Sequence, residues 1–106
     1  MSRFDVFRNT GEHAAVVPFL LDVQSEVLSS LDTRVVIPLR RRDSLPAIRF
    51  PANLMPEVVV DGVECLLETP KLAAVPVRLL KDQPVTALTN NQFEITAALD
   101  FLFQGY

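Results

Sequence analysis

The hydrophobic pattern of the chain changes character near residue 85. Before that point, Pro, Gly or Asp interrupts the chain at short intervals, and the segments between are rich in Val, Leu and Phe. Short runs of such residues between turn-forming residues are typical of β-strands. The pattern predicts strands at Arg3–Arg8, Val16–Val23, Arg34–Leu39, Glu57–Val60, Val63–Leu67 and Val75–Leu80.

Asp61-Gly62 is the clearest turn signal in this part of the chain. The dipeptide separates the Val-rich runs Glu57–Val60 and Val63–Leu67. Asp-Gly readily supplies the two positive φ angles of a type I′ turn, so we expect a β-hairpin here.

The eight prolines divide the chain unequally, because none follows Pro84. Pro38 and Pro76 lie inside apolar runs, where a strand loses a ladder hydrogen bond. We therefore expect the strands that hold them to be edge strands or bent. The stretch after Pro84 is the only long one without a helix breaker, and it predicts a helix.

Local signals define both ends of this helix. Thr89 and Gln92 have the spacing of a capping box, and Gly105 suits a helix stop. Between them, one apolar face combines two stripes at helical spacing, formed by Ile95, Ala98, Leu99 and Leu102 and by Phe93, Ala97 and Phe101. Strands followed by one terminal helix favour a mainly β fold, a small and strongly bent antiparallel sheet or barrel capped by that helix.

Composition supports one domain over residues 1–106. The chain has 49% hydrophobic residues, enough for one core at this length. Cys65 is the only cysteine, so no intrachain disulfide forms, and we interpret it as a core thiol. The first residues lack the apolar run of a signal peptide, and no apolar stretch is long enough for a membrane span. We expect a cytoplasmic protein.

Candidate chemistry is sparse. His13 is the only histidine and no metal-binding spacing is present, so we expect no catalytic residues, no metal and no cofactor. Asp22 and Glu26 could pair for acid–base work, but this spacing is nonspecific. The formal net charge of −3 argues against direct nucleic acid binding.

Positive charge is concentrated in one segment. Arg40, Arg41, Arg42 and Arg49 stand there against the single acid Asp43. We interpret the segment as a basic loop, which is either a solvated connection or a docking patch for an acidic partner.

Four blocks of sequence, taken together, resemble the CcdB family, the toxins of toxin–antitoxin pairs that poison DNA gyrase. The match is collinear and reaches the end of the chain. It comprises Asp22–Ser25 (DVQS), Arg34–Leu39 (RVVIPL), Ala74–Val77 (AVPV) and Ala97–Tyr106 (AALDFLFQGY).

The resemblance implies an SH3-like β-barrel that forms a two-fold homodimer and has no enzymatic activity. The dimer would insert between the gyrase A subunits and trap the enzyme with its DNA cleaved. By position, the gyrase-binding residues would be Gln104, Gly105, Tyr106, Phe103, Asp100, Val27 and Leu28.

Gln104 departs from the family pattern, because the best-known members have tryptophan there. The indole of that tryptophan can lie on a gyrase arginine, a cation–π contact worth roughly 0.5–2 kcal/mol. This chain has no tryptophan. Tyr106 offers an aromatic ring two residues later, where the family residue is usually aliphatic.

The resemblance implies a second partner, a CcdA-like antitoxin with a disordered acidic segment that folds on binding. Arg40, Arg41 and Arg42 are the predicted antitoxin-binding residues. Two alternatives stay open: a protein of this fold that binds antitoxin but has lost gyrase poisoning, and an mRNA endoribonuclease toxin.

Overall fold

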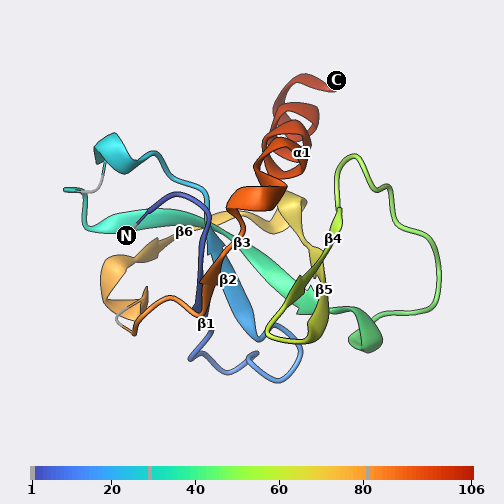
Figure 1. Cartoon of the computed structure of the whole chain (residues 1–106), viewed down its shortest axis with the longest axis horizontal. Coiled ribbons are helices and arrows are strands. Elements are labelled where there is room, and N and C mark those ends of the chain that lie inside the picture. The colour runs from blue at the N-terminus through green and yellow to red at the C-terminus, as the bar shows by residue number, and fades with distance from the viewer. Residues whose placement is uncertain (1, 29, 81) are drawn as a thin grey trace.

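The computed structural model describes residues 2–28, 30–80 and 82–106, and this part of the chain is mainly β (Figure 1). Its strands are β1 (Asp5–Arg8), β2 (Phe19–Asp22), β3 (Thr33–Arg41), β4 (Glu57–Val60), β5 (Val63–Leu67), β6 (Ala73–Pro76) and β7 (Thr86–Ala87). One α-helix, α1 (Gln92–Gln104), follows them. Short 3-10 helices connect these elements: η1 (Glu26–Leu28), η2 (Arg42–Ser44), η3 (Thr69–Lys71), η4 (Val77–Leu80) and η5 (Thr89–Asn91).

The strands form one antiparallel sheet in the order β4-β5-β3-β2-β1-β7, with β6 also paired to β3. Strand β3 is the centre of this sheet. Its residues 33–36 pair with β6 and its residues 39–41 pair with β5, while β2 lies along its other edge. The sheet closes most of the way into a barrel, which confirms the mainly β fold with a terminal helix.

The two prolines in strands have different surroundings. Pro38 lies where β3 changes neighbours from β6 to β5, so the missing amide falls between the two paired segments. Of the two alternatives, an edge strand or a bent one, the structure excludes the edge strand for Pro38, because β3 has partners on both sides. Pro76 ends β6, which pairs only with β3, as expected for an edge strand.

The hairpin of β4 and β5 has the predicted bounds and the predicted turn. Asp61 and Gly62 have φ values of 51° and 77°, as the type I′ turn requires. The last predicted strand is wrong beyond Pro76, because the chain turns into η4 and the Val77 amide bonds to the Asp32 carbonyl. Strand β7 has only two residues, too few for a recognisable pattern.

Helix α1 ends as predicted but begins differently. Gly105 has φ 82°, and its amide donates to the Phe101 carbonyl at 2.9 Å. The capping box is wrong, because η5 precedes the helix and the Gln92 amide donates to the backbone carbonyl of Thr89 rather than to its hydroxyl.

Only the inner side of α1 contacts the barrel. Ile95 is fully buried in the main core and Ala98 is fully buried as well, and Leu99 packs against the same core. Phe93 is 83% exposed, so the expectation that it joins the apolar face is wrong. The helix projects away from the barrel, and the C-terminus lies at its far end (Figure 1).

Cys65 lies in the main core, with no exposed surface. Burial raises the pKa of its thiol to about 11, so the uncharged form persists at neutral pH. This agrees with a core thiol.

Candidate functional site

A buried ion pair joins the end of β2 to the start of β3. The Arg34 guanidinium donates from Nε to Asp22 Oδ2 at 2.9 Å and from Nη2 to Asp22 Oδ1 at 3.0 Å. The two side chains are 1% and 0% exposed. No pattern in the sequence indicates this pair, although Asp22 and Arg34 each begin one of the four blocks of sequence described above.

Opposing effects act on the Asp22 carboxyl. Burial raises its pKa, while hydrogen bonds from Arg34 and from the Gln24 amide act in the opposite direction. The carboxylate is therefore stable in the core only as long as Arg34 stays paired with it.

Gln24 continues this network into the loop between β2 and β3. Its Nε2 donates to the carbonyls of Leu28 and Thr33, both at 3.2 Å, and its Oε1 accepts from the Val35 amide at 3.0 Å. Arg34 donates in turn to the Gln24 carbonyl at 3.1 Å. These bonds fix both ends of the β2–β3 loop, which contains η1.

The same segment exposes apolar side chains. Val27 is 87% exposed and Leu28 is 45% exposed. The Val27 amide donates to Ser25 Oγ, and the Gln24 amide donates to Asp22 Oδ1. Asp22 and Ser25 thus form turns through side-chain to backbone hydrogen bonds. The network positions a protrusion on which Val27 and Leu28 are displayed.

A second protrusion is the end of α1, which carries the other predicted gyrase-binding residues. Phe103 is 71% exposed and Tyr106 is 83% exposed, and Asp100, Gln104 and Gly105 are exposed beside them. The left-handed Gly105 directs Tyr106 away from the helix axis. Two aromatic rings are therefore exposed to solvent at the C-terminal end of α1.

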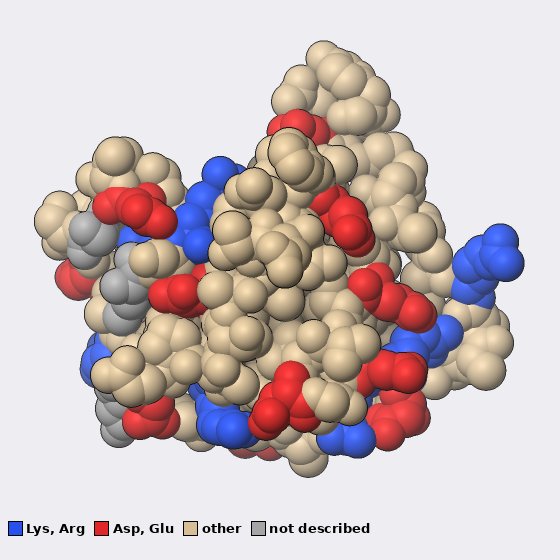
Figure 2. All heavy atoms as spheres, viewed as in Figure 1, with Lys and Arg blue, Asp and Glu red and all other residues tan. Residues whose placement is uncertain are grey.

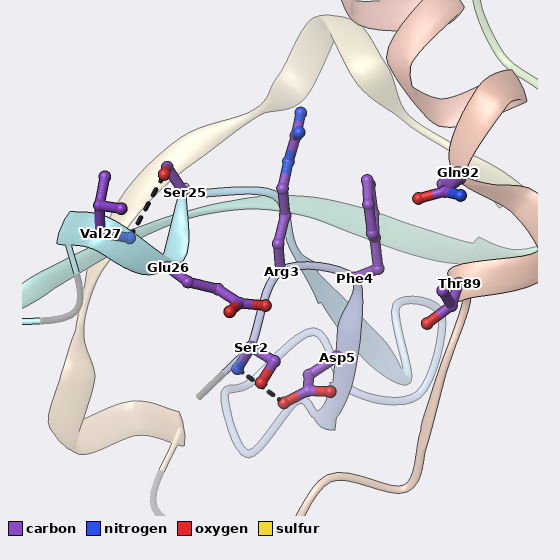
Figure 3. Close-up of a pocket in the computed structure, with 9 residues that line it drawn as sticks. All are labelled: Ser2, Arg3, Phe4, Asp5, Ser25, Glu26, Val27, Thr89 and Gln92. Carbon is purple, nitrogen blue, oxygen red and sulfur yellow. Dashed lines mark hydrogen bonds between the residues drawn. The ribbon is translucent and has the colours of Figure 1, made fainter.

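The two protrusions remain separate, with a hollow of about 420 Å³ between η1 and the start of α1. Val27 and Gln92 line opposite sides of this hollow, and Arg3 and Phe4 lie between them (Figure 3). The structure thus brings Val27 near the base of the helix but not near its tip.

The predicted basic loop is wrong in part, because Arg40 and Arg41 are the last residues of β3. Arg41 forms a bidentate pair with Asp43 at 3.1 and 3.0 Å, and this pair lowers the pKa of the Asp43 carboxyl. Arg40 Nε donates to Ser44 Oγ at 3.2 Å.

Arg42 has a structural environment of its own. It pairs with Glu57 at 3.0 Å, donates to the carbonyls of Pro46 and Ile48, and stacks over Phe50 at 5.2 Å. The hydrogen bonds of Arg42 therefore stabilise the conformation of residues 46–48, which follow η2. On the face drawn in Figure 2, acidic and basic side chains are interspersed.

Other candidate chemistry is limited in the described ranges. His13 is largely exposed, with Glu12 at 3.6 Å. No three His, Cys, Asp or Glu side chains of residues 2–28, 30–80 and 82–106 come together in a way that could hold a metal ion. Over the same residues, no helix has both the length and the apolar character needed to cross a bilayer.

The fold and the displayed residues are those of a small β-barrel protein that presents apolar side chains on two protrusions, as binding surfaces do. The chain matches the family model described as CcdB protein over residues 3–105, and it therefore belongs to the CcdB family. The family relationship makes it a toxin of the toxin–antitoxin type. A search of curated proteins found no match.

Removing the carboxylate of the buried pair is expected to destabilise the fold. Asp22→Ala leaves Arg34 charged and unpaired in the core, which costs about 3–5 kcal/mol. Urea unfolding followed by circular dichroism measures this loss. Asp43→Ala is the matched control, because it removes a solvent-exposed partner of Arg41 and should change the midpoint little. Equal midpoints for the two variants would contradict the role given to the buried pair.

Proposed function

We propose that this protein poisons DNA gyrase, by binding the A subunits and trapping the complex in which gyrase has cleaved DNA. Membership of the CcdB family is the observation that carries the proposal. The exposed tip of α1 supports it, because Phe103 and Tyr106 have no core contact that would account for two aromatic rings. The displayed Val27 and Leu28 support it further.

Poisoning requires a preference for one state of gyrase. A ligand shifts a conformational equilibrium only by its differential affinity for the two states. We propose a two-fold homodimer that presents two tails to the two A subunits, since matching symmetry lets both tails engage in the same state. The rigid helix keeps each tail at a fixed distance from its barrel.

Tyr106 is the residue on which we base the aromatic contact. Gln104 has an amide that hydrogen-bonds but no aromatic face, so it does not replace a tryptophan. Tyr106 is 83% exposed at the chain end and offers both a ring and a hydroxyl.

The antitoxin is the second proposed partner, with Arg40, Arg41 and Arg42 as its docking residues. Arg41 is the best placed of the three, because its partner Asp43 is solvent-exposed and readily exchanged. Arg42 is instead tied to Glu57 and to two backbone carbonyls.

The activity itself is tested with purified protein, supercoiled DNA, gyrase and RNA. We expect linear DNA only when gyrase is present, because the protein supplies binding and gyrase supplies the cleavage. Cleaved RNA without gyrase would instead establish the endoribonuclease alternative. Antitoxin binding with neither product would establish a protein that has lost gyrase poisoning.

Tyr106→Ala is expected to relieve growth arrest on induced expression. Loss of an aromatic interface residue should raise the concentration needed for half-maximal DNA linearisation roughly tenfold or more. Phe93→Ala is the matched control, since it removes an equally exposed ring near the opposite end of α1. Unchanged toxicity of Tyr106→Ala would rule out the aromatic contact.

Arg41→Glu is expected to slow antitoxin association, mostly in the on-rate and most strongly at low salt, because it reverses a surface charge. Stopped-flow mixing at two ionic strengths measures the effect. Arg78→Glu makes the same change of net charge on η4 and serves as the control. Equal on-rates for the two variants would remove Arg41 from the docking surface.

A further inference from the structure

The hollow between η1 and α1 contains a half-buried arginine whose hydrogen-bonding capacity is largely unused. Arg3 Nε donates to the Val23 carbonyl at 3.1 Å. Among the described residues, its two terminal nitrogens form no hydrogen bond and no ion pair, so this bond from Nε is the one that Arg3 donates. A guanidinium has five donors, so most of the donors of Arg3 are available to a ligand.

The backbone next to Arg3 is strained in a way that orients this side chain. Phe4 has φ 76°, a left-handed conformation that bulky residues rarely adopt. Hydrogen bonds hold it there, from the Phe4 amide to the Asp22 carbonyl at 2.7 Å and from the Leu88 amide to the Phe4 carbonyl at 2.9 Å. Strain that the surrounding structure maintains is a feature of ligand sites.

The positive φ of Phe4 changes the direction in which neighbouring side chains point. Successive side chains of a regular strand point to opposite faces, but Arg3 and Phe4 point the same way (Figure 3). The Arg3 guanidinium lies 4.8 Å from the centroid of the Phe4 ring, within cation–π distance. The ring and the Val23 carbonyl thus hold the guanidinium in place before any partner arrives.

Arg3 also lies between η1, which is one of the two protrusions to which the proposed function assigns gyrase binding, and the base of α1, whose tip is the other. Val27 of η1 and Gln92 of α1 line the same hollow. In Figure 2, Lys or Arg atoms occupy the notch between the η1 lobe and the column formed by α1. A partner that binds Val27 and reaches along α1 from its base would lie next to Arg3.

We propose that Arg3 binds one carboxylate side chain, Asp or Glu, of the gyrase A subunit, an inference that rests on the proposed function. A planar guanidinium fork matches the two oxygens of a carboxylate. Asp5 and Glu26 line the same hollow, and their charges disfavour a polyanion such as the DNA backbone. A single negative charge is therefore the better ligand.

The test is a titration of the intact gyrase A subunit, without DNA, with wild-type protein and four variants. Arg3→Glu should weaken binding roughly 10- to 100-fold, because a charge-assisted hydrogen bond becomes a repulsion. Arg3→Lys should give an intermediate affinity, since it keeps the charge but loses the fork. Arg8→Glu, at the last residue of β1 and paired only loosely with Asp61 at 3.5 Å, should bind like wild type.

Glu26→Gln provides an independent test, because Arg3 substitutions also disturb the bond to Val23. This change removes a competing negative charge at an exposed position and should strengthen gyrase binding a few-fold. Weaker binding would mean that the hollow takes a cation. A parallel titration with DNA added completes the test, and an effect of Arg3→Glu seen only there would mean that the hollow takes a phosphate. Either result overturns the proposal.

Failure of this inference is distinguishable from failure of the proposed function. A wild-type protein that does not bind the gyrase A subunit contradicts both. Wild-type binding that Arg3→Glu leaves unchanged contradicts only the role of Arg3.

Discussion

Two opposite charges, on Asp22 and Arg34, lie in the interior with almost no contact with water. Such a pair is stable only when its geometry compensates for the lost hydration. Here Arg34 donates twice to Asp22 and once to the Gln24 carbonyl, while its Nη1 has no partner among the described residues. Well-packed apolar residues often stabilise a core equally well. The pair also contributes specificity, which apolar residues do not. Its directional hydrogen bonds fix the position of the end of β2 relative to the start of β3.

The functional surface follows from that junction. Gln24 extends the ion pair to both ends of the β2–β3 loop, so the position of η1 depends on charges buried beneath it. Strand β3 then pairs with β6 before Pro38 and with β5 after it, within a sheet that closes most of the way into a barrel. Helix α1 rests on this barrel by one side only and leaves its tip free. One rigid body thus presents two protrusions with a hollow between them.

How much of this could be predicted from the sequence depends on how local each feature is. The Asp61-Gly62 turn and the Gly105 helix stop were predictable, because each depends on the φ preference of its own residues. The helix start was not, since Gln92 bonds to the Thr89 carbonyl, an alternative that competes with the side-chain cap. The Asp22–Arg34 pair joins residues 12 positions apart, and no periodic pattern indicates such a pairing.

The candidate site also has some features that could be predicted from the sequence and others that could not. The exposure of the helix tip could be anticipated, because a chain end beyond a helix stop has little to pack against. The prediction of a basic loop was wrong in part, because Arg40 and Arg41 belong to β3. Charge density also does not indicate that Arg42 donates to Glu57 and to two backbone carbonyls. No sequence pattern indicated Arg3, because the orientation of its side chain depends on the positive φ of Phe4.

The central claim, that the chain end contacts gyrase while its DNA is cleaved, is tested most directly by site-specific cross-linking. The photoreactive amino acid p-benzoylphenylalanine replaces Tyr106 and keeps an aromatic ring at that position. Irradiation during DNA cleavage should join position 106 to the gyrase A subunit. Persistent poisoning without any cross-link to gyrase, or with cross-links only within the toxin itself, would contradict the account.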